Sequence, residues 1–369
     1  MTEPDRYSWA QAGAEDLGGG VHRIPLPLPM AGLKAVNVYA LIDDQGVDLI
    51  DAGMGLSQAR TRLTDALKLL GCELGDIRNF FITHVHRDHY TLAVDLRRSR
   101  YGSISLGVGE QANLAAARAL ASGDGAGEFY KDLLWMGAVE IAAKLEAGGR
   151  GDRPGAHEWE EPDRWLDDGT ELTARTHTLR AIHTPGHTRG HLVYHDAAAS
   201  VLFAGDHILP HITPTIGMEP ARNRTALRDY LDSLRLVLTL PDARLLPAHG
   251  PVQDSTHKRV HELLAHHEQR LSEMLAAMTP GRSTAYEVAQ AIRWTRRQQR
   301  FAELETISQL LAVGETAAHL ELLVIRGQLT RHSDGSGTDH YEPVPARQAL
   351  SPSAPVRTRH GRPYAQVKG

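Results

Sequence analysis

The chain has 369 residues, of which 41% are hydrophobic, which is enough to bury a large core and to form about two domains. Its formal charge of −5 gives no overall attraction to nucleic acid, and no run of about 18 apolar residues predicts a membrane span. The single cysteine, Cys72, excludes an intrachain disulfide, and with the lack of an apolar export signal it favours the cytoplasm.

The first hundred residues alternate strands and helices. Apolar, β-prone runs between turn residues predict strands at 21–24, 36–42, 47–50, 79–84 and 103–107. Leu63, Leu67 and Leu70 recur at helical spacing, and a second helix is expected near 90–100. Asp51 follows the third strand and is either a turn residue or an acid near a functional site.

Residues 108–160 form an alanine-rich insertion with two glycine-rich breaks. It holds no set of ligand-type residues, but it contains an apolar cluster around Trp135 that a loop would not require. We expect helices that cap a cleft and shape a substrate pocket, with ordinary packing or a dimer contact as the alternative.

The chain then returns to strands, which are expected at 176–183, 191–195 and 200–205. A leucine stripe predicts a helix at 223–240 that ends before Pro241. A strand at 244–246 follows and leads directly to His249.

Residues 256–345 are predicted to form a separate helical domain. Apolar residues keep helical spacing from Val260 to Met278 and stop at a Thr-Pro-Gly sequence. Helices are then expected from 284, over about 299–312 and over 315–326, followed by a hairpin with its turn at 334–337. Residues 346–369 hold basic but no acidic residues and are predicted to form a flexible basic tail.

Four short motifs concentrate residue types that bind metals. The first, Thr83 to His89, follows a strand, where loops expose side chains. The others are His183-Thr-Pro-Gly-His187-Thr-Arg-Gly-His191, Gly205-Asp206 and Ala248-His249-Gly250. One His-x-His pair alone is weak evidence, but the histidines and aspartates of these four motifs together predict two adjacent metal sites.

In this order the motifs resemble those of the metallo-β-lactamase-fold metallohydrolases, whose first motif is His-x-His-x-Asp-His. The resemblance covers about residues 20–252 and implies an α/β fold, an αββα sandwich with metals at one edge of its paired sheets. The hydrolase domain is then expected to span residues 1–255. The resemblance also implies one metal on His84, His86 and His187, a second on Asp88, His89 and His249, and a bridge through Asp206.

Imidazole and carboxylate ligands suit two divalent metal ions, zinc first, with iron and manganese as alternatives. Asp88 is the expected catalytic residue, because it would orient a metal-bridging hydroxide as well as bind metal. The other histidines of these segments are expected to support the ligands or line the pocket. They are His183, His191, His195, His207 and His211.

The three helices and hairpin of residues 256–345 resemble the winged-helix module that one branch of this family carries. Its third helix has Glu315 and Glu321 against Arg326, which is unfavourable for contact with phosphates. A basic run at 293–300 is more often a solvated surface than a nucleic-acid site.

These features predict a binuclear metal-dependent hydrolase that cleaves a small-molecule thioester, ester or lactone. The alternative is a single-strand-specific endoribonuclease with the same metal centre, so nucleic acid stays a second possible partner. A non-catalytic scaffold is disfavoured by the complete ligand set. We expect a cytoplasmic enzyme without membrane association, and homo-oligomers are left open.

Overall fold

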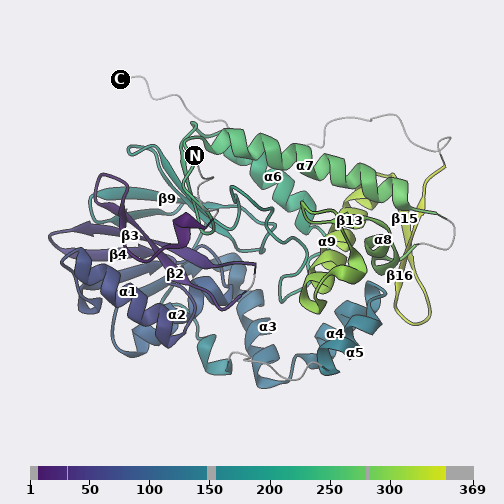
Figure 1. Ribbon diagram of the computed structural model, residues 1–369, viewed down its shortest axis with the longest axis horizontal. Coiled ribbons are helices and arrows are strands. Elements are labelled where there is room, and N and C mark those ends of the chain that lie inside the picture. Colours follow the sequence, from purple (N-terminus) through teal and green to yellow (C-terminus); the bar gives the residue numbers. More distant parts are fainter. Residues whose placement is uncertain (1–6, 31, 148–154, 280–282, 346–369) are drawn as a thin grey trace.

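The computed structural model describes residues 7–30, 32–147, 155–279 and 283–345. Two sheets lie face to face with helices on both outer sides (Figure 1). The expected αββα sandwich is therefore confirmed. The predicted tail, 346–369, lies outside the described residues.

The first sheet has seven strands in chain order and is parallel from β4 to β7. Its strands are β1 (Glu15–Asp16), β2 (Val21–Pro27), β3 (Ala35–Asp43), β4 (Gly46–Ile50), β5 (Ile77–Phe81), β6 (Ser103–Gly107) and β7 (Arg164–Leu166). The outer face of this sheet packs against α1 (Ser57–Leu69), α2 (Arg87–Arg98) and α3 (Gln111–Ser122).

The second sheet has five strands in the order β12-β11-β10-β9-β8. These are β8 (Glu171–Ala174), β9 (His177–His183), β10 (Leu192–Asp196), β11 (Val201–Gly205) and β12 (Arg244–Pro247). Alternation along β10 places Tyr194 in the core between the sheets and Val193 in the core on the outer face. Helix α6 (Ala226–Val237) packs on that outer face.

The outer core of the second sheet continues into the C-terminal region without a break. One apolar cluster joins α6 to the insertion helices α4 (Ala126–Trp135) and α5 (Val139–Ala147) and to α7 (Thr256–Ala277), α8 (Ala285–Ala291) and α9 (Thr306–Ile325). Two short hairpins complete the region: β13 (Arg293–Trp294) with β14 (Gln299–Arg300), and β15 (Leu329–Ser333) with β16 (Asp339–Pro343). The predicted last hairpin is confirmed.

The prediction of two helices at 299–312 and 315–326 is wrong, because residues 299–303 form β14 and a short 3-10 helix, and a single helix, α9, then runs from Thr306 to Ile325. Gly314 lies inside α9, where the close approach of another segment accounts for a glycine. A Cβ at Gly314 would lie 2.2 Å from the sulfur of Met218. Among the described residues α9 is also long and apolar enough to cross a membrane, yet 72% of that stretch is buried inside the molecule.

Candidate metal centre

All four motifs lie at one edge of the two sheets. His84 and His86 follow β5, and Asp88 and His89 occupy the first turn of α2. His187 lies in the loop between β9 and β10, Asp206 follows β11, and His249 follows β12. The structure thus brings together all seven residues that the motifs predicted, in two groups that could hold metal ions.

Three imidazole nitrogens converge in the first group. His86 Nδ1 lies 2.9 Å from both His84 Nε2 and His187 Nε2, and the two Nε2 atoms are 3.2 Å apart. Burial lowers the pKa of His84 well below its usual value, that of His86 to about 3 and that of His187 to about 4. Neutral imidazoles offer lone pairs, which is the form that binds metal.

The second group combines Asp88, His89 and His249. Asp88 Oδ2 lies 3.4 Å from His249 Nε2 and 3.8 Å from His89 Nε2. Burial opposes a charge on His89, but Asp88, Asp51 and Asp206 together raise its pKa to about 10. The carboxylates of this group therefore favour a positive charge at its centre.

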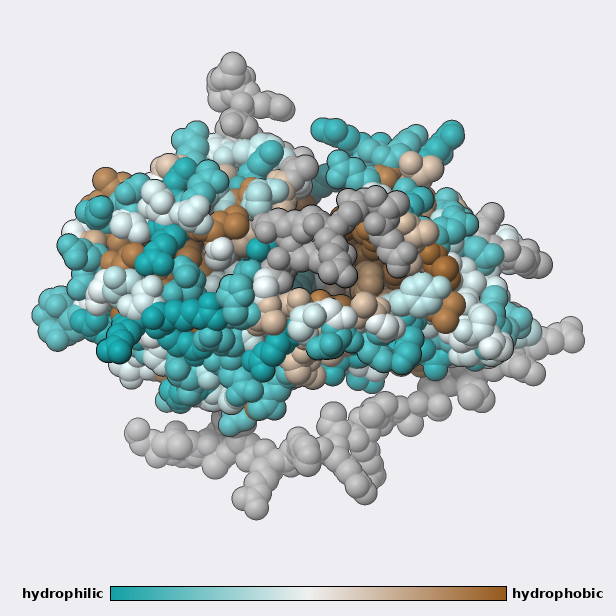
Figure 2. All heavy atoms as spheres, turned by 90° about the horizontal axis from the view of Figure 1, so that it is seen from below, coloured by the Kyte–Doolittle hydropathy of each residue, from teal (hydrophilic) through white to brown (hydrophobic). Residues whose placement is uncertain are grey.

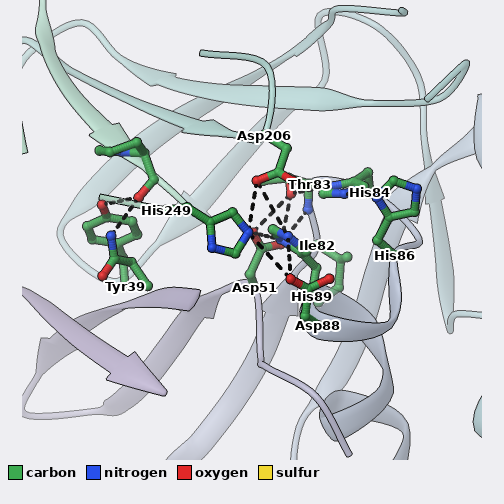
Figure 3. Close-up of polar contacts among 12 residues, drawn as sticks. Tyr39, Asp51, Ile82, Thr83, His84, His86, Asp88, His89, Asp206 and His249 are labelled. Atoms are coloured by element: carbon green, nitrogen blue, oxygen red, sulfur yellow. Dashed lines mark hydrogen bonds and ion pairs between the residues drawn. The ribbon is translucent and has the colours of Figure 1, made fainter. Parts of the chain in front are cut away.

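Asp206 lies between the two groups (Figure 3). Its Oδ2 is 3.5 Å from His187 Nε2 in the first group. Its Oδ1 is 3.3 Å from His249 Nε2 and 3.6 Å from His89 Nε2 in the second. This is the arrangement expected of a carboxylate that bridges two cations.

Three buried atoms at this centre have no hydrogen-bond partner among the described residues: His89 Nε2, His249 Nε2 and Asp206 Oδ1. Buried polar atoms are costly to leave unpaired, and all three face a common point between the groups. A cation bound there would satisfy them. The donor set therefore fits a metal centre.

The outward nitrogens of the imidazoles are held by hydrogen bonds. His249 Nδ1 lies 2.8 Å from the carbonyl oxygen of Ala35, and His187 Nδ1 lies 2.8 Å from that of Thr215. A carbonyl oxygen only accepts, so each Nδ1 carries the proton and each Nε2 keeps a lone pair for the centre.

Asp51 supports both His89 and the loop that carries His84. Its carboxylate accepts from His89 Nδ1 at 2.8 Å, from the Thr83 backbone N–H at 2.8 Å and from the Thr83 hydroxyl at 3.0 Å (Figure 3). Asp51 adopts φ +59°, a left-handed conformation that only a few residue types tolerate. Of the two interpretations that the sequence allowed, a turn residue or an acid near a functional site, the structure supports the second.

The additional histidines fall into different places. His191 Nε2 accepts the backbone N–H of Asp206 at 3.2 Å, and its ring stacks on that of His84. His183 Nε2 donates to the carbonyl oxygen of Arg189 in the His187 loop, at 2.7 Å. His207 is buried beside His191, whereas His195 pairs with Leu202 inside the second sheet.

A buried acidic network behind the His187 loop has no motif in the sequence. The Thr188 hydroxyl donates to Glu110, and Asn113 Nδ2 donates to both Glu110 and Glu219, at 2.9 and 2.8 Å. Burial raises the pKa of Glu110 to about 7. These residues are far apart in the chain, so only the fold reveals that they act on one loop.

Comparison with known families identifies both parts of the chain. Residues 31–249 match the family described as the metallo-beta-lactamase superfamily. Residues 271–344 match the one described as the metallo-beta-lactamase-like C-terminal domain.

Solved structures with this fold cover nearly the whole chain. A metallo-beta-lactamase family protein from Thermus thermophilus is 27% identical with a TM-score of 0.72, covering 89% of this chain and 100% of its own. A beta-lactamase domain protein from Burkholderia ambifaria is 25% identical with a TM-score of 0.68, covering 90% and 93%.

Two curated relatives match smaller parts. The Beta-lactamase-like protein 2 homolog of Caenorhabditis elegans is 33% identical over 114 residues, 31% of this chain and 36% of the relative. The atrochrysone carboxyl ACP thioesterase of Aspergillus fumigatus is 25% identical over 253 residues, 68% of this chain and 46% of the relative. The chain thus aligns with less than half the length of either relative.

Proposed function

The chain belongs to the metallo-β-lactamase superfamily of hydrolases, and on this premise we propose that it uses two metal ions to cleave a small-molecule thioester, ester or lactone. One observation carries the proposal. Asp206 faces ligand atoms of both groups, and the imidazole nitrogens that face it in the second group have no hydrogen-bond partner among the described residues. Two cations so placed would share one carboxylate.

Divalent cations bound there would supply Lewis acidity and would lower the pKa of a bound water molecule toward about 7. The protein's own residues fix where that chemistry takes place. His84, His86 and His187 would hold one ion, and Asp88, His89 and His249 the other. Zinc suits this set best, with iron or manganese as alternatives.

We assign the catalytic role to Asp88. It is the most exposed of the carboxylates at the centre, with 14% of its side chain accessible, so it can accept a hydrogen bond from a water molecule at the opening. Its place in the first turn of α2 favours the ionised form that such a bond requires. A covalent intermediate is not expected, because the hydroxyl beside His84, that of Thr83, is bonded to Asp51.

Thioesters are the first substrates to test. The Aspergillus fumigatus relative is named as a thioesterase that acts on an acyl carrier protein, and its match extends over 253 residues. Attack at the carbonyl carbon of a thioester, an ester or a lactone needs the same groups, so the pocket around the centre would decide among them.

The C-terminal region supports a small-molecule substrate rather than RNA. We propose that its winged-helix-like arrangement serves packing, because α9, the helix that would enter a nucleic-acid groove, contacts α5, α6, α7 and α8. Glu321 of α9 is buried and paired with Arg224 and Arg331. Residues 312–323 of α9 are buried apart from the half-buried Glu315, so this stretch has no exposed face for base contacts.

The test combines metal analysis of the purified protein with a panel of thioesters, lactones, a chromogenic lactam and labelled single-stranded RNA. We expect thioester or ester cleavage that His86→Ala lowers by more than about 100-fold. The matched control is His332→Ala, since His332 is exposed on β15. If RNA cleavage dominates and disappears in His86→Ala alone, the ribonuclease alternative replaces this proposal.

A further inference from the structure

A cavity of about 220 Å³ lies between α3, α4 and the segment 217–222. Figure 2 shows the face of the molecule on this side, where apolar residues border a hollow. The cavity is larger than the space of about 150 Å³ that accommodates benzene in an engineered apolar cavity, so it holds one substituted ring. Its apolar lining comprises Ala116, Ala119, Leu120, Phe129, Leu133, Trp135, Met136, Met218 and Pro220.

Three carboxylates line the cavity, and of these Glu219 is buried, whereas Asp132 is half-buried and Glu128 is exposed. Glu219 is 7% exposed, and its Oε2 accepts from Asn113 Nδ2 and from the backbone N–H of Arg189, both at 2.8 Å, and from Arg189 Nε at 3.3 Å. Its Oε1 is buried and has no hydrogen-bond partner among the described residues. Leaving a buried acceptor unpaired is costly, and Glu219 belongs to the lining of the cavity, so a ligand in the cavity that supplies a donor would relieve this cost.

The wall of the cavity that contains Trp135 is fixed by the C-terminal region. The guanidinium carbon of Arg224 lies 4.5 Å from the ring centre of Trp135. Arg224 Nη1 is itself held by Glu321 of α9, at 2.7 Å, and by Asp339 of β16, at 2.6 Å. The Thr338 hydroxyl adds a hydrogen bond to the Leu134 carbonyl of α4, at 3.1 Å. The cavity is therefore pre-formed rather than opened by the ligand.

Glu219 also connects the cavity to the metal centre. Its Oε2 holds the backbone of Arg189, two residues beyond His187. Through Asn113 it shares a hydrogen-bond network with Glu110, which accepts from Thr188. A ligand against Glu219 would therefore lie behind the loop that carries a metal-ligand histidine.

We propose that this cavity binds the end of the substrate that lies away from the bond to be cleaved. The structure fits a single ring, or a short branched chain, that carries a hydroxyl group donating to Glu219 Oε1. This assignment rests on the proposed function and narrows its substrate class to hydroxylated acyl or aryl groups. It also gives the insertion helix α4 and the C-terminal hairpin one common purpose.

The first experiment measures binding to the metal-free protein by calorimetry at pH 8. We expect wild type to bind 4-ethylphenol, which can donate a hydrogen bond, about tenfold more tightly than 4-methylacetophenone, which only accepts. Glu219→Gln should reverse this order, because its amide oxygen must take the place of Oε2 against three donors and turn the NH₂ group toward the cavity. Ala119→Leu, which fills the cavity, should weaken both ligands.

Equal binding of the two ligands in wild type, or an unchanged order in Glu219→Gln, overturns the assignment. The second experiment tests the link to catalysis, with 4-ethylphenol added during hydrolysis of the best thioester or ester. Competitive inhibition supports a substrate pocket, and non-competitive inhibition or none refutes it. If no substrate of the panel is cleaved while the reversal still occurs, the proposed function and the substrate assignment fail together, but the cavity stands as a ligand site.

Discussion

Asp51→Asn is expected to weaken metal binding while preserving the shape of the side chain. Asp51 Oδ1 faces the Thr83 backbone N–H, and Oδ2 faces His89 Nδ1, each at 2.8 Å. An asparagine has one oxygen, so its NH₂ group must meet one of these two donors. With the oxygen on Thr83, the NH₂ group faces His89 Nδ1, so the neutral imidazole that binds metal would favour its proton on Nε2, the atom that faces the centre.

The size of the effect follows from this exchange. A proton on Nε2 removes His89 from the donor set of the second group, leaving Asp88, His249 and the shared Asp206. Loss of such a supporting partner lowers metal affinity by about 10- to 100-fold, which is about 1.4–2.7 kcal/mol. The first group should be affected less, because His84 contacts Asp51 only through the Thr83 hydroxyl.

The assay is a zinc titration against a chromophoric chelator, with metal content measured after dialysis. Asp196→Asn is the matched control, because Asp196 Oδ2 lies 2.6 Å from His177 Nδ1 in an equally buried pair on the second sheet. We expect the control to lose stability without losing zinc. If Asp51→Asn binds both zinc ions within twofold of wild type, the inferred tautomer of His89 is wrong.

Three further outcomes are expected. Gly186→Ala would place a methyl group 2.4 Å from the backbone of α6, so it should lower the unfolding free energy by about 2–3 kcal/mol and should lose zinc because His187 is displaced. The control Gly127→Ala meets open space and should change the unfolding free energy little. Urea denaturation measures both. Burial lowers the pKa of His319 to about 3, so as the pH falls the unfolded chain takes up a proton near pH 6.5, where folded His319 stays neutral. The unfolding free energy should therefore fall by about 1.4 kcal/mol from pH 8 to pH 5.5. His319→Leu should lose this contribution to the pH dependence of the unfolding free energy. Removal of zinc by a chelator should lower the unfolding free energy by about 2.7 kcal/mol, compared with protein at a free zinc concentration about 100 times the dissociation constant. When zinc rebinds at pH 7, His89 should release a proton, which a titration in weak buffer detects.

The sequence was sufficient for most elements and for the composition of the centre. Strand and helix periods are local, so the runs at 21–24 and 47–50 mark β2 and β4 directly. The seven ligand-type residues could be found because each lies in a short motif. Their grouping around Asp206 required the resemblance, since nothing local relates β5 to β11.

The parts that the sequence did not predict depend on contacts between distant segments. Gly314 lies inside α9, and no local signal shows that the absence of its side chain makes room for Met218. Glu219 has no motif, and its role depends on Asn113, which lies 106 residues earlier. From the sequence, Asp51 could be a turn residue or an acid near the site, and only its hydrogen bonds to Thr83 and His89 decide between the two.

The apolar cluster that α6 shares with the last three helices makes the folding of the second sheet and that of the C-terminal region depend on each other. A chain cut after residue 255 would expose to water the apolar sides of α5 and α6 that the last three helices cover, so we expect it to aggregate rather than to form a smaller enzyme. Melting should accordingly occur in a single step. A different C-terminal domain would therefore fit this enzyme only if the surfaces of α5 and α6 that it contacts changed with it.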